Sequence, residues 1–215
     1  MWPSADCSPP VVPDAGLCAN NEMIDILVVD DHPAVRAGLV VLMRSEPGIV
    51  PVAAAGGVQD ALKHAKRCRA RVAVIDYDLD DGTGLELCYE LKLLPHAPGV
   101  LIYTAFARND LLLAARAAAA DGLVEKGARP EELFAAIRSI ASGRLVPLPV
   151  TPKQMVAGSR RLESEDLPIL GMLLERESPA SIAETLGVGA SEVRGRVRKI
   201  LGALAATAVP RRPKR

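Results

Sequence analysis

Aromatic residues are scarce in this sequence, at 3% of the chain, and its four cysteines lie far apart with no Cys-x-x-Cys pair. A hydrophobic core must therefore consist mainly of Ala, Val, Leu and Ile, and we expect neither a zinc site nor a disulfide framework. No apolar run approaches the ~20 residues that span a bilayer. No Lys or Arg precedes Arg36, which argues against a secretory signal. These absences predict a cytoplasmic protein with no membrane contact.

The sequence also has no net charge, yet its charges are unevenly distributed. Residues 1–150 contain 14 Lys and Arg against 19 Asp and Glu, whereas residues 151–215 contain 12 against 7. This split predicts two units with different partners, the basic one being a candidate for nucleic acid. We expect a disordered tail rich in Pro, Ala and Ser, whose end at Met23 suggests an alternative start codon. The expected order is tail 1–22, first domain 23–143, linker 144–162, second domain 163–207 and basic tail 208–215.

Apolar runs alternate with helical patterns along the first domain. Runs without polar alternation, such as residues 72–75, are typical of strands buried on both faces of a parallel sheet. Five such runs are each followed by a segment with apolar residues at helical spacing. We therefore expect a doubly wound α/β fold with a five-stranded parallel sheet. The expected strands are 24–29, 50–55, 72–76, 100–103 and 122–125.

Polar residues follow the ends of four of these strands: Asp30 and Asp31, then Asp76, Thr104 and Lys126. The ends of parallel strands share one edge of the sheet, so these side chains should converge there. Carboxylates so close together repel unless a cation neutralises them, and oxygen ligands of this kind favour Mg²⁺. Asp76 could then attack a phosphoryl group. One Asp after a strand more often makes a turn or a cap, but five matching positions favour a site.

This order of residues resembles the receiver domain of two-component response regulators over about residues 24–143. The Asp30-Asp31-His32-Pro33 segment is similar to regulators of the LuxR/FixJ (NarL) type. The resemblance implies a flavodoxin-like fold, Asp76 as phosphoacceptor, and a sensor histidine kinase as partner. The implied Mg²⁺ ligands are Asp30, Asp31, Asp76 and the carbonyl of Asp78. The implied phosphoryl-binding residues are Thr104, Ala105 and Lys126.

Two positions depart from the family pattern. Asp80 stands where the family commonly has proline, and Leu123 stands where it often has an aromatic switch residue. These departures leave a phosphorylation-independent regulator as an alternative. A second alternative is a phosphatase with Asp76 as nucleophile, since Asp76-x-Asp78 after a strand also resembles haloacid-dehalogenase-type enzymes. An EF-hand is excluded, because Asp81 and Leu87 occupy the positions that require Gly and Glu.

The basic end has the pattern of a helix-turn-helix. Ser178-Pro179 is an N-cap signal, Gly187 and Gly189 flank a tight turn, and a basic helix is expected over 191–204. On a helical wheel its apolar positions face the core, whereas its basic residues point outward or lie on the flanks. A solvated basic face would give the same pattern, but the spacing and charge split favour DNA. The predicted DNA-binding residues are Ser191, Arg194, Arg196, Arg198 and Lys199.

Residues 163–204 are similar to the LuxR-type DNA-binding domain, notably in Ile182-Ala183-Glu184 and in Ile200-Leu201. Gly195 weakens the expected recognition helix, and the family's fourth helix, which serves dimerisation, looks truncated. The resemblance implies a small all-α domain that binds double-stranded promoter DNA, with a homodimer as the active form. We therefore expect a transcriptional regulator controlled by phosphorylation, and no enzyme.

Overall fold

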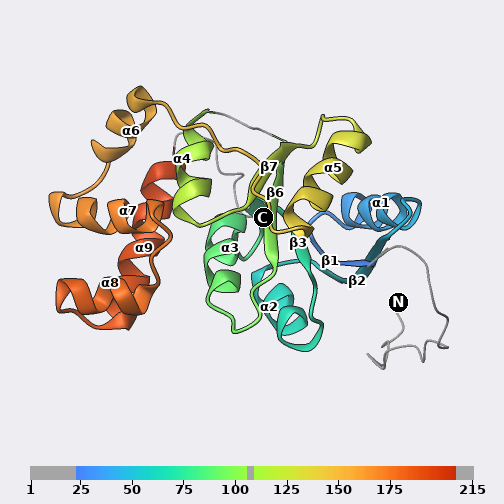
Figure 1. Cartoon of the computed structure of the whole chain (residues 1–215), viewed down its shortest axis with the longest axis horizontal. Helices are drawn as coiled ribbons and strands as arrows, with labels where there is room; N and C mark the ends of the chain where they lie inside the picture. The colour runs from blue at the N-terminus through green and yellow to red at the C-terminus, as the bar shows by residue number, and fades with distance from the viewer. Residues whose placement is uncertain (1–22, 106–108, 207–215) are drawn as a thin grey trace.

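The computed structural model describes residues 23–105 and 109–206, so the predicted tails 1–22 and 208–215 lie outside it. Five parallel strands form one sheet in the order β2-β1-β3-β6-β7 (Figure 1). This is the order of flavodoxin-like folds, and it confirms the sheet predicted from the apolar runs. The strands are β1 Ile24–Val29, β2 Ile49–Ala55, β3 Val72–Asp76, β6 Gly99–Thr104 and β7 Gly122–Glu125.

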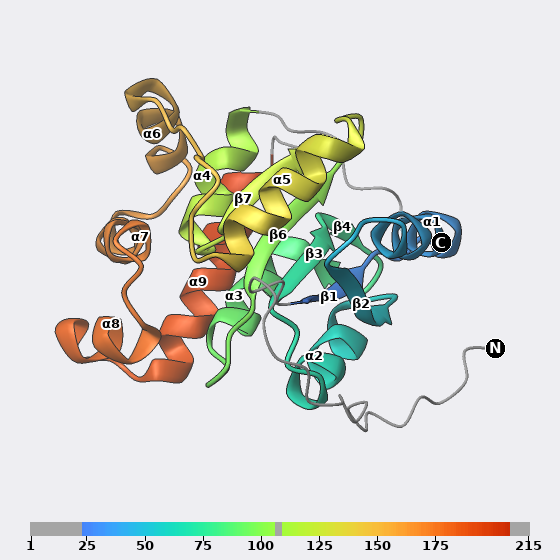
Figure 2. The same ribbon diagram turned by 45° about the vertical axis from the view of Figure 1, so that its right-hand side comes forward.

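Helices cover both faces of the sheet (Figures 1 and 2). α1 (Pro33–Arg44) and α5 (Pro130–Ala141) cover one face, and α2 (Val58–Arg67), α3 (Gly84–Lys92) and α4 (Asn109–Ala117) cover the other. Successive residues of a strand point to opposite faces, so each strand contributes to both cores. In β1, for example, Ile26 packs with the α1 and α5 side and Leu27 with the other.

The C-terminal region consists of short helices. They are α6 (Pro152–Ser159), a 3₁₀ turn η1 (Ser164–Asp166), α7 (Leu167–Leu174), α8 (Pro179–Leu186) and α9 (Ala190–Ala205). The Ser178 hydroxyl accepts a hydrogen bond from the Ser181 N–H at 3.1 Å, and Gly187 ends α8 in the left-handed conformation. These caps confirm the predicted start and end of the short helix. The predicted core positions of α9, such as Val193 and Val197, are fully buried.

The helical region packs against α4, so α4 is buried between it and the sheet (Figure 1). Gly158 of α6 shows how close this contact is, because a Cβ there would lie 2.3 Å from Cδ2 of Leu113 in α4. The segment interpreted as a linker, 144–162, therefore includes a packed helix. Among the described residues, no helix combines the length and apolar character needed to cross a membrane.

One element was not predicted. Between β3 and α3 the chain forms a small antiparallel hairpin, in which β4 (Asp78–Leu79) pairs with β5 (Gly82–Thr83). Strands of two residues have no detectable period, so the sequence shows only an acidic turn there. The hairpin lies directly after Asp76, and its geometry therefore bears on the predicted site.

Candidate functional site

The carboxyl edge of the sheet brings together the residues predicted to meet there. Asp30 follows β1 and is completely buried, and Asp76 ends β3 with 6% of its surface exposed. Lys126 follows β7, and its Nζ donates to Oδ2 of Asp30 at 2.7 Å and to Oδ2 of Asp76 at 2.8 Å. These three side chains come from positions up to 96 residues apart. Parallel pairing of β1, β3 and β6, with β7 beside β6, brings them together.

The charges at this edge are only partly balanced. Burial, reinforced by the neighbouring Asp30 and Asp31, raises the pKa of Asp76 against the opposing effect of Lys126. Burial also raises the pKa of Asp31, and the nearby Asp80 adds to the increase. For Lys126, burial alone would lower the pKa, but hydrogen bonds to Asp30 and Asp76 raise it, so the ammonium is retained. Three carboxylates thus share one ammonium, which leaves an excess of negative charge.

This excess fits a divalent cation. Ligand atoms of Asp30, Asp31, His32 and Asp76 all lie within 4.8 Å of one another. Carboxylate oxygens in such a cluster suit Mg²⁺, which binds through a few carboxylates and retains water. His32 was not predicted as part of the cluster, although its position directly after Asp31 in the sequence could have indicated that it lies there. Its Nδ1 lies 2.6 Å from Oδ1 of Asp31, so the two groups form an ion pair when the imidazole is protonated.

The remaining predicted residues lie around this centre. Thr104 ends β6 and is 2% exposed, and its carbonyl accepts a hydrogen bond from the Lys126 N–H at 2.7 Å. Ala105 follows it on the surface. Asp78 lies in β4, and its carboxylate is outside the cluster that could hold a metal ion. The role of its carbonyl as a Mg²⁺ ligand stays a prediction.

Asp81 was also missed as a structural residue. Its Oδ1 accepts a hydrogen bond from the Val58 N–H at 2.7 Å, and its Oδ2 accepts one from the Gln59 N–H at 3.1 Å. The carboxylate therefore caps the N-terminus of α2 from a position 23 residues later in the chain. Gly57, directly before α2, has no side chain that could do so.

The predicted DNA-binding residues of α9 differ in their surroundings. Ser191, Arg194, Arg198 and Lys199 are exposed. Arg196, by contrast, is 18% exposed at its side chain, and its Nε donates to Oδ1 of Asp166 at 2.7 Å. This ion pair joins α9 to the start of α7. Arg196 thus has a structural partner within the helical region that the helical wheel could not show.

The basic face of α9 is turned toward the first domain. Nη2 of Arg198 donates to Oε1 of Glu90 in α3 at 2.8 Å. Arg194 and Arg198 also lie close enough to Tyr89 to oppose the effect of burial, which raises the pKa of that phenol to about 12. Figures 1 and 2 both show α9 beside α3. In this arrangement α3 lies beside the predicted DNA-binding residues of α9.

A second contact between the domains lies at the loop between α4 and β7. Nη1 of Arg176, just after α7, donates to Oδ1 of Asp121 at 3.1 Å, and its Nη2 donates to the Ala120 carbonyl at 2.9 Å. Asp121 is 7% exposed, and Lys92 of α3 is its other ionic partner. Arg176 adopts a left-handed conformation with φ of 62°, which a non-glycine residue rarely does. The contact therefore depends on a specific backbone geometry.

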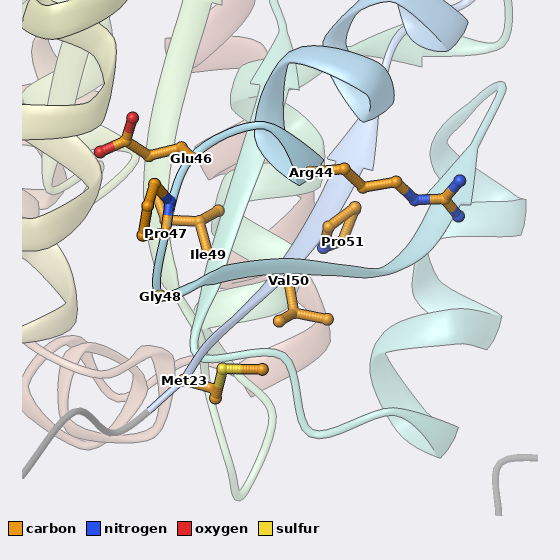
Figure 3. A pocket seen from close by; sticks show the side chains of 8 residues that line it. All are labelled: Met23, Arg44, Glu46, Pro47, Gly48, Ile49, Val50 and Pro51. Atoms are coloured by element: carbon orange, nitrogen blue, oxygen red, sulfur yellow. The ribbon is translucent and has the colours of Figure 1, made fainter.

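A hollow of about 410 Å³ lies away from these residues, beside β2 (Figure 3). Its two charged lining residues, Arg44 and Glu46, point away from each other in this view. Glu46 is paired with Arg138 of α5. The hollow offers no converging polar groups, so the acidic edge remains the candidate site.

Comparison with known proteins agrees with this geometry. Residues 26–138 match the family model described as "Response regulator receiver domain". The chain is 31% identical to the DNA-binding transcriptional activator DevR/DosR of Mycobacterium tuberculosis, over 85% of this chain and 88% of the relative. It is 30% identical to the response regulator UvrY of Escherichia coli, over 80% and 78%. A crystal structure of a LuxR-family two-component response regulator from Aurantimonas sp. superposes with a TM-score of 0.55 and 32% identity, over 63% of this chain and 96% of that one.

Proposed function

The chain belongs to the family of response regulators with a receiver domain, and from this premise we propose that it is a transcriptional regulator whose DNA binding is controlled by phosphorylation of Asp76. The observation that supports the proposal best is the pairing of Lys126 with both Asp30 and Asp76 at the carboxyl edge of the sheet. A relative named as a DNA-binding transcriptional activator matches over 85% of this chain.

The chemistry that we assign to the site is transfer of a phosphoryl group from a phosphohistidine of a sensor kinase. An Asp76 oxygen attacks phosphorus, the P–N bond breaks, and the imidazole leaves as a neutral group after taking a proton. Lys126 retains its proton, so its ammonium can follow the charge from the carboxylate to the new phosphoryl oxygens. Thr104 and Ala105 lie at the end of β6, where they can contact the same oxygens.

Asp30, Asp31, Asp76 and the carbonyl of Asp78 are the residues that we assign to Mg²⁺. Bound there, the ion would neutralise the clustered carboxylates and stabilise charge on the phosphoryl oxygens. The imidazole of His32 lies beside the Asp31 carboxylate. The raised pKa of Asp31 and Asp76 supports the assignment, because both record an excess of negative charge.

We assign DNA contact to the exposed residues of α9, namely Ser191, Arg194, Arg198 and Lys199. In the structure Glu90 of α3 pairs with Arg198, and we propose that α9 must move away from α3 before it enters a major groove. Phosphorylation would favour the released form, and a homodimer of released chains would bind promoter DNA. We place this activity in the cytoplasm, where the thiols of Cys68 and Cys88 stay reduced.

The experiment that tests this function is intact-mass analysis of the full-length protein after incubation with acetyl phosphate and Mg²⁺. We expect a gain of one phosphoryl group that disappears in Asp76→Asn. Asp78→Asn is the matched control, because it removes a neighbouring carboxylate and leaves the main-chain carbonyl in place. A phosphoryl group that persists in Asp76→Asn would contradict the assignment. If the wild type gains none from either acetyl phosphate or a phosphorylated histidine kinase, regulation by phosphorylation is excluded.

A further inference from the structure

In the proposed site, the hairpin β4–β5 must hold the Asp78 carbonyl in place for Mg²⁺. Its sequence, however, is typical of a flexible and highly charged turn. It contains no proline, and Asp78, Asp80 and Asp81 bring three carboxylates into four residues next to Asp76. Two backbone features restrain it: pairing of Asp78 with Thr83, and a hydrogen bond of 2.7 Å from the Gly84 N–H to the Tyr77 carbonyl. Neither of them fixes the hairpin relative to the rest of the domain.

Leu79 packs in the core of the domain, and Asp81 makes the polar connection. Its two oxygens accept hydrogen bonds from the first two N–H groups of α2, those of Val58 and Gln59. These groups are left unpaired by the helix itself, and the N-terminus of a helix favours negative charge. The Asp81 carboxylate therefore lies at the N-terminus of α2, whereas Asp80, which is exposed like Asp81, adds to the excess charge at Asp31.

The absence of a side chain at Gly57 leaves space for the contact between Asp81 and α2. A Cβ at position 57 would lie 2.6 Å from Oδ1 of Asp81, which is closer than real side chains approach. The backbone of Gly57 is extended, with φ of −175°, so any residue could adopt its conformation. Space for Asp81 is thus the reason that position 57 requires glycine. The hairpin also packs closely at Gly82, where a Cβ would lie 3.0 Å from Cγ2 of Val58.

We propose that Asp81 is a positioning residue of the phosphorylation site, which anchors the β4–β5 hairpin to the N-terminus of α2 and so holds the Asp78 carbonyl in place for Mg²⁺. The inference rests on the proposed function for the identity of the ion. It adds a residue that contacts neither the ion nor the phosphoryl group, together with Gly57, which leaves room for its carboxylate.

The test is the Mg²⁺ affinity of the unphosphorylated full-length protein, measured by isothermal titration calorimetry. Asp81→Ala should weaken binding about tenfold, the loss typical when support for a metal ligand is removed. Asp80→Ala is the matched control, since it removes a carboxylate from the same hairpin without removing the anchor, and it should change affinity far less. Asp81→Asn keeps one acceptor oxygen and should give an intermediate loss.

Gly57 supplies a second, independent variant. Gly57→Ala should displace Asp81 and weaken Mg²⁺ binding as Asp81→Ala does, and the double variant should lose no more than either single one. Melting curves in EDTA establish that each variant is folded. Wild-type affinity in Asp81→Ala, equal losses in Asp81→Ala and Asp80→Ala, or additive losses in the double variant would overturn the inference. A wild type that binds no Mg²⁺ would instead refute the magnesium assignment itself.

Discussion

The two charged regions of the molecule use their residues in opposite ways. At the sheet edge, Lys126 is held by Asp30 and Asp76, and all three belong to the same domain. On α9, the basic residues are divided among partners: Arg196 pairs with Asp166 in its own domain, Arg198 pairs with Glu90 in the other, and Arg194 and Lys199 are exposed.

The phosphorylation site is preorganised, whereas the DNA-binding residues of α9 are partly engaged by another domain. The sheet edge is assembled before any phosphoryl group arrives, because strands fixed by backbone pairing position its side chains. The predicted DNA-binding residues of α9 are also in place, but Arg198 is paired with Glu90 of α3, and in the proposed function this contact must break before DNA binds. In the proposed function, the phosphoryl group is therefore transferred at the sheet edge, and the result is a change in the contacts of α9.

The largest effect on DNA affinity should come from Arg194→Ala. Arg194 is an exposed residue of α9, so its loss should remove a charged contact to DNA. We expect about tenfold weaker binding of the phosphorylated protein to a duplex selected from a random library. Arg129→Ala removes another exposed arginine, from the first domain, and should leave affinity unchanged. Equal affinities for wild type and Arg194→Ala would disprove the assignment of this face.

Arg196→Ala should instead reduce stability. It would leave Asp166, which is 8% exposed, without the guanidinium that binds it. The expected loss in the free energy of unfolding is about 2 kcal/mol, since an unpaired buried acceptor is costly. Urea denaturation measures this, with Arg194→Ala as the variant that should unfold like wild type. If both variants have the same stability, Arg196 has no structural role.

Glu90→Gln should produce a smaller change, with the opposite sign for DNA binding. It removes the carboxylate that pairs with Arg198, and an exposed ion pair is worth at most about 1 kcal/mol. We expect DNA affinity of the unphosphorylated protein to rise about two- to fivefold. Glu131→Gln in α5 is the control on a different surface. No change in Glu90→Gln would show that this ion pair does not hold α9.

The smallest effect concerns pH in the absence of metal. Burial raises the pKa of Asp76 above its ordinary value of 3.8, so the folded protein holds this proton more tightly than the unfolded chain does. The resulting stability is fully present below pH 3.8 and is lost as the pH rises through the raised pKa. In EDTA, the melting temperature of Asp76→Asn minus that of wild type should therefore increase from about pH 4 to 7. A constant difference would contradict the pKa direction.

The sequence predicted the sheet edge well and the contacts between elements poorly. Asp30, Asp76 and Lys126 could be placed together because parallel strands that end in polar residues must share an edge. The partner of Asp81 lies 23 residues away, that of Arg196 lies 30 away, and that of Arg198 lies 108 away. No local period encodes these contacts, since they depend on how helices pack in space. A helical wheel gives the direction of a side chain and not the residue that it meets.

The most direct test of the account is amide hydrogen exchange across α3 and α9 of the full-length protein, with and without acetyl phosphate and Mg²⁺. The account predicts faster exchange in both helices when Asp76 is phosphorylated, and no change in Asp76→Asn treated in the same way. Unchanged exchange in protein whose mass confirms a phosphoryl group on Asp76 would contradict the claim that phosphorylation releases α9.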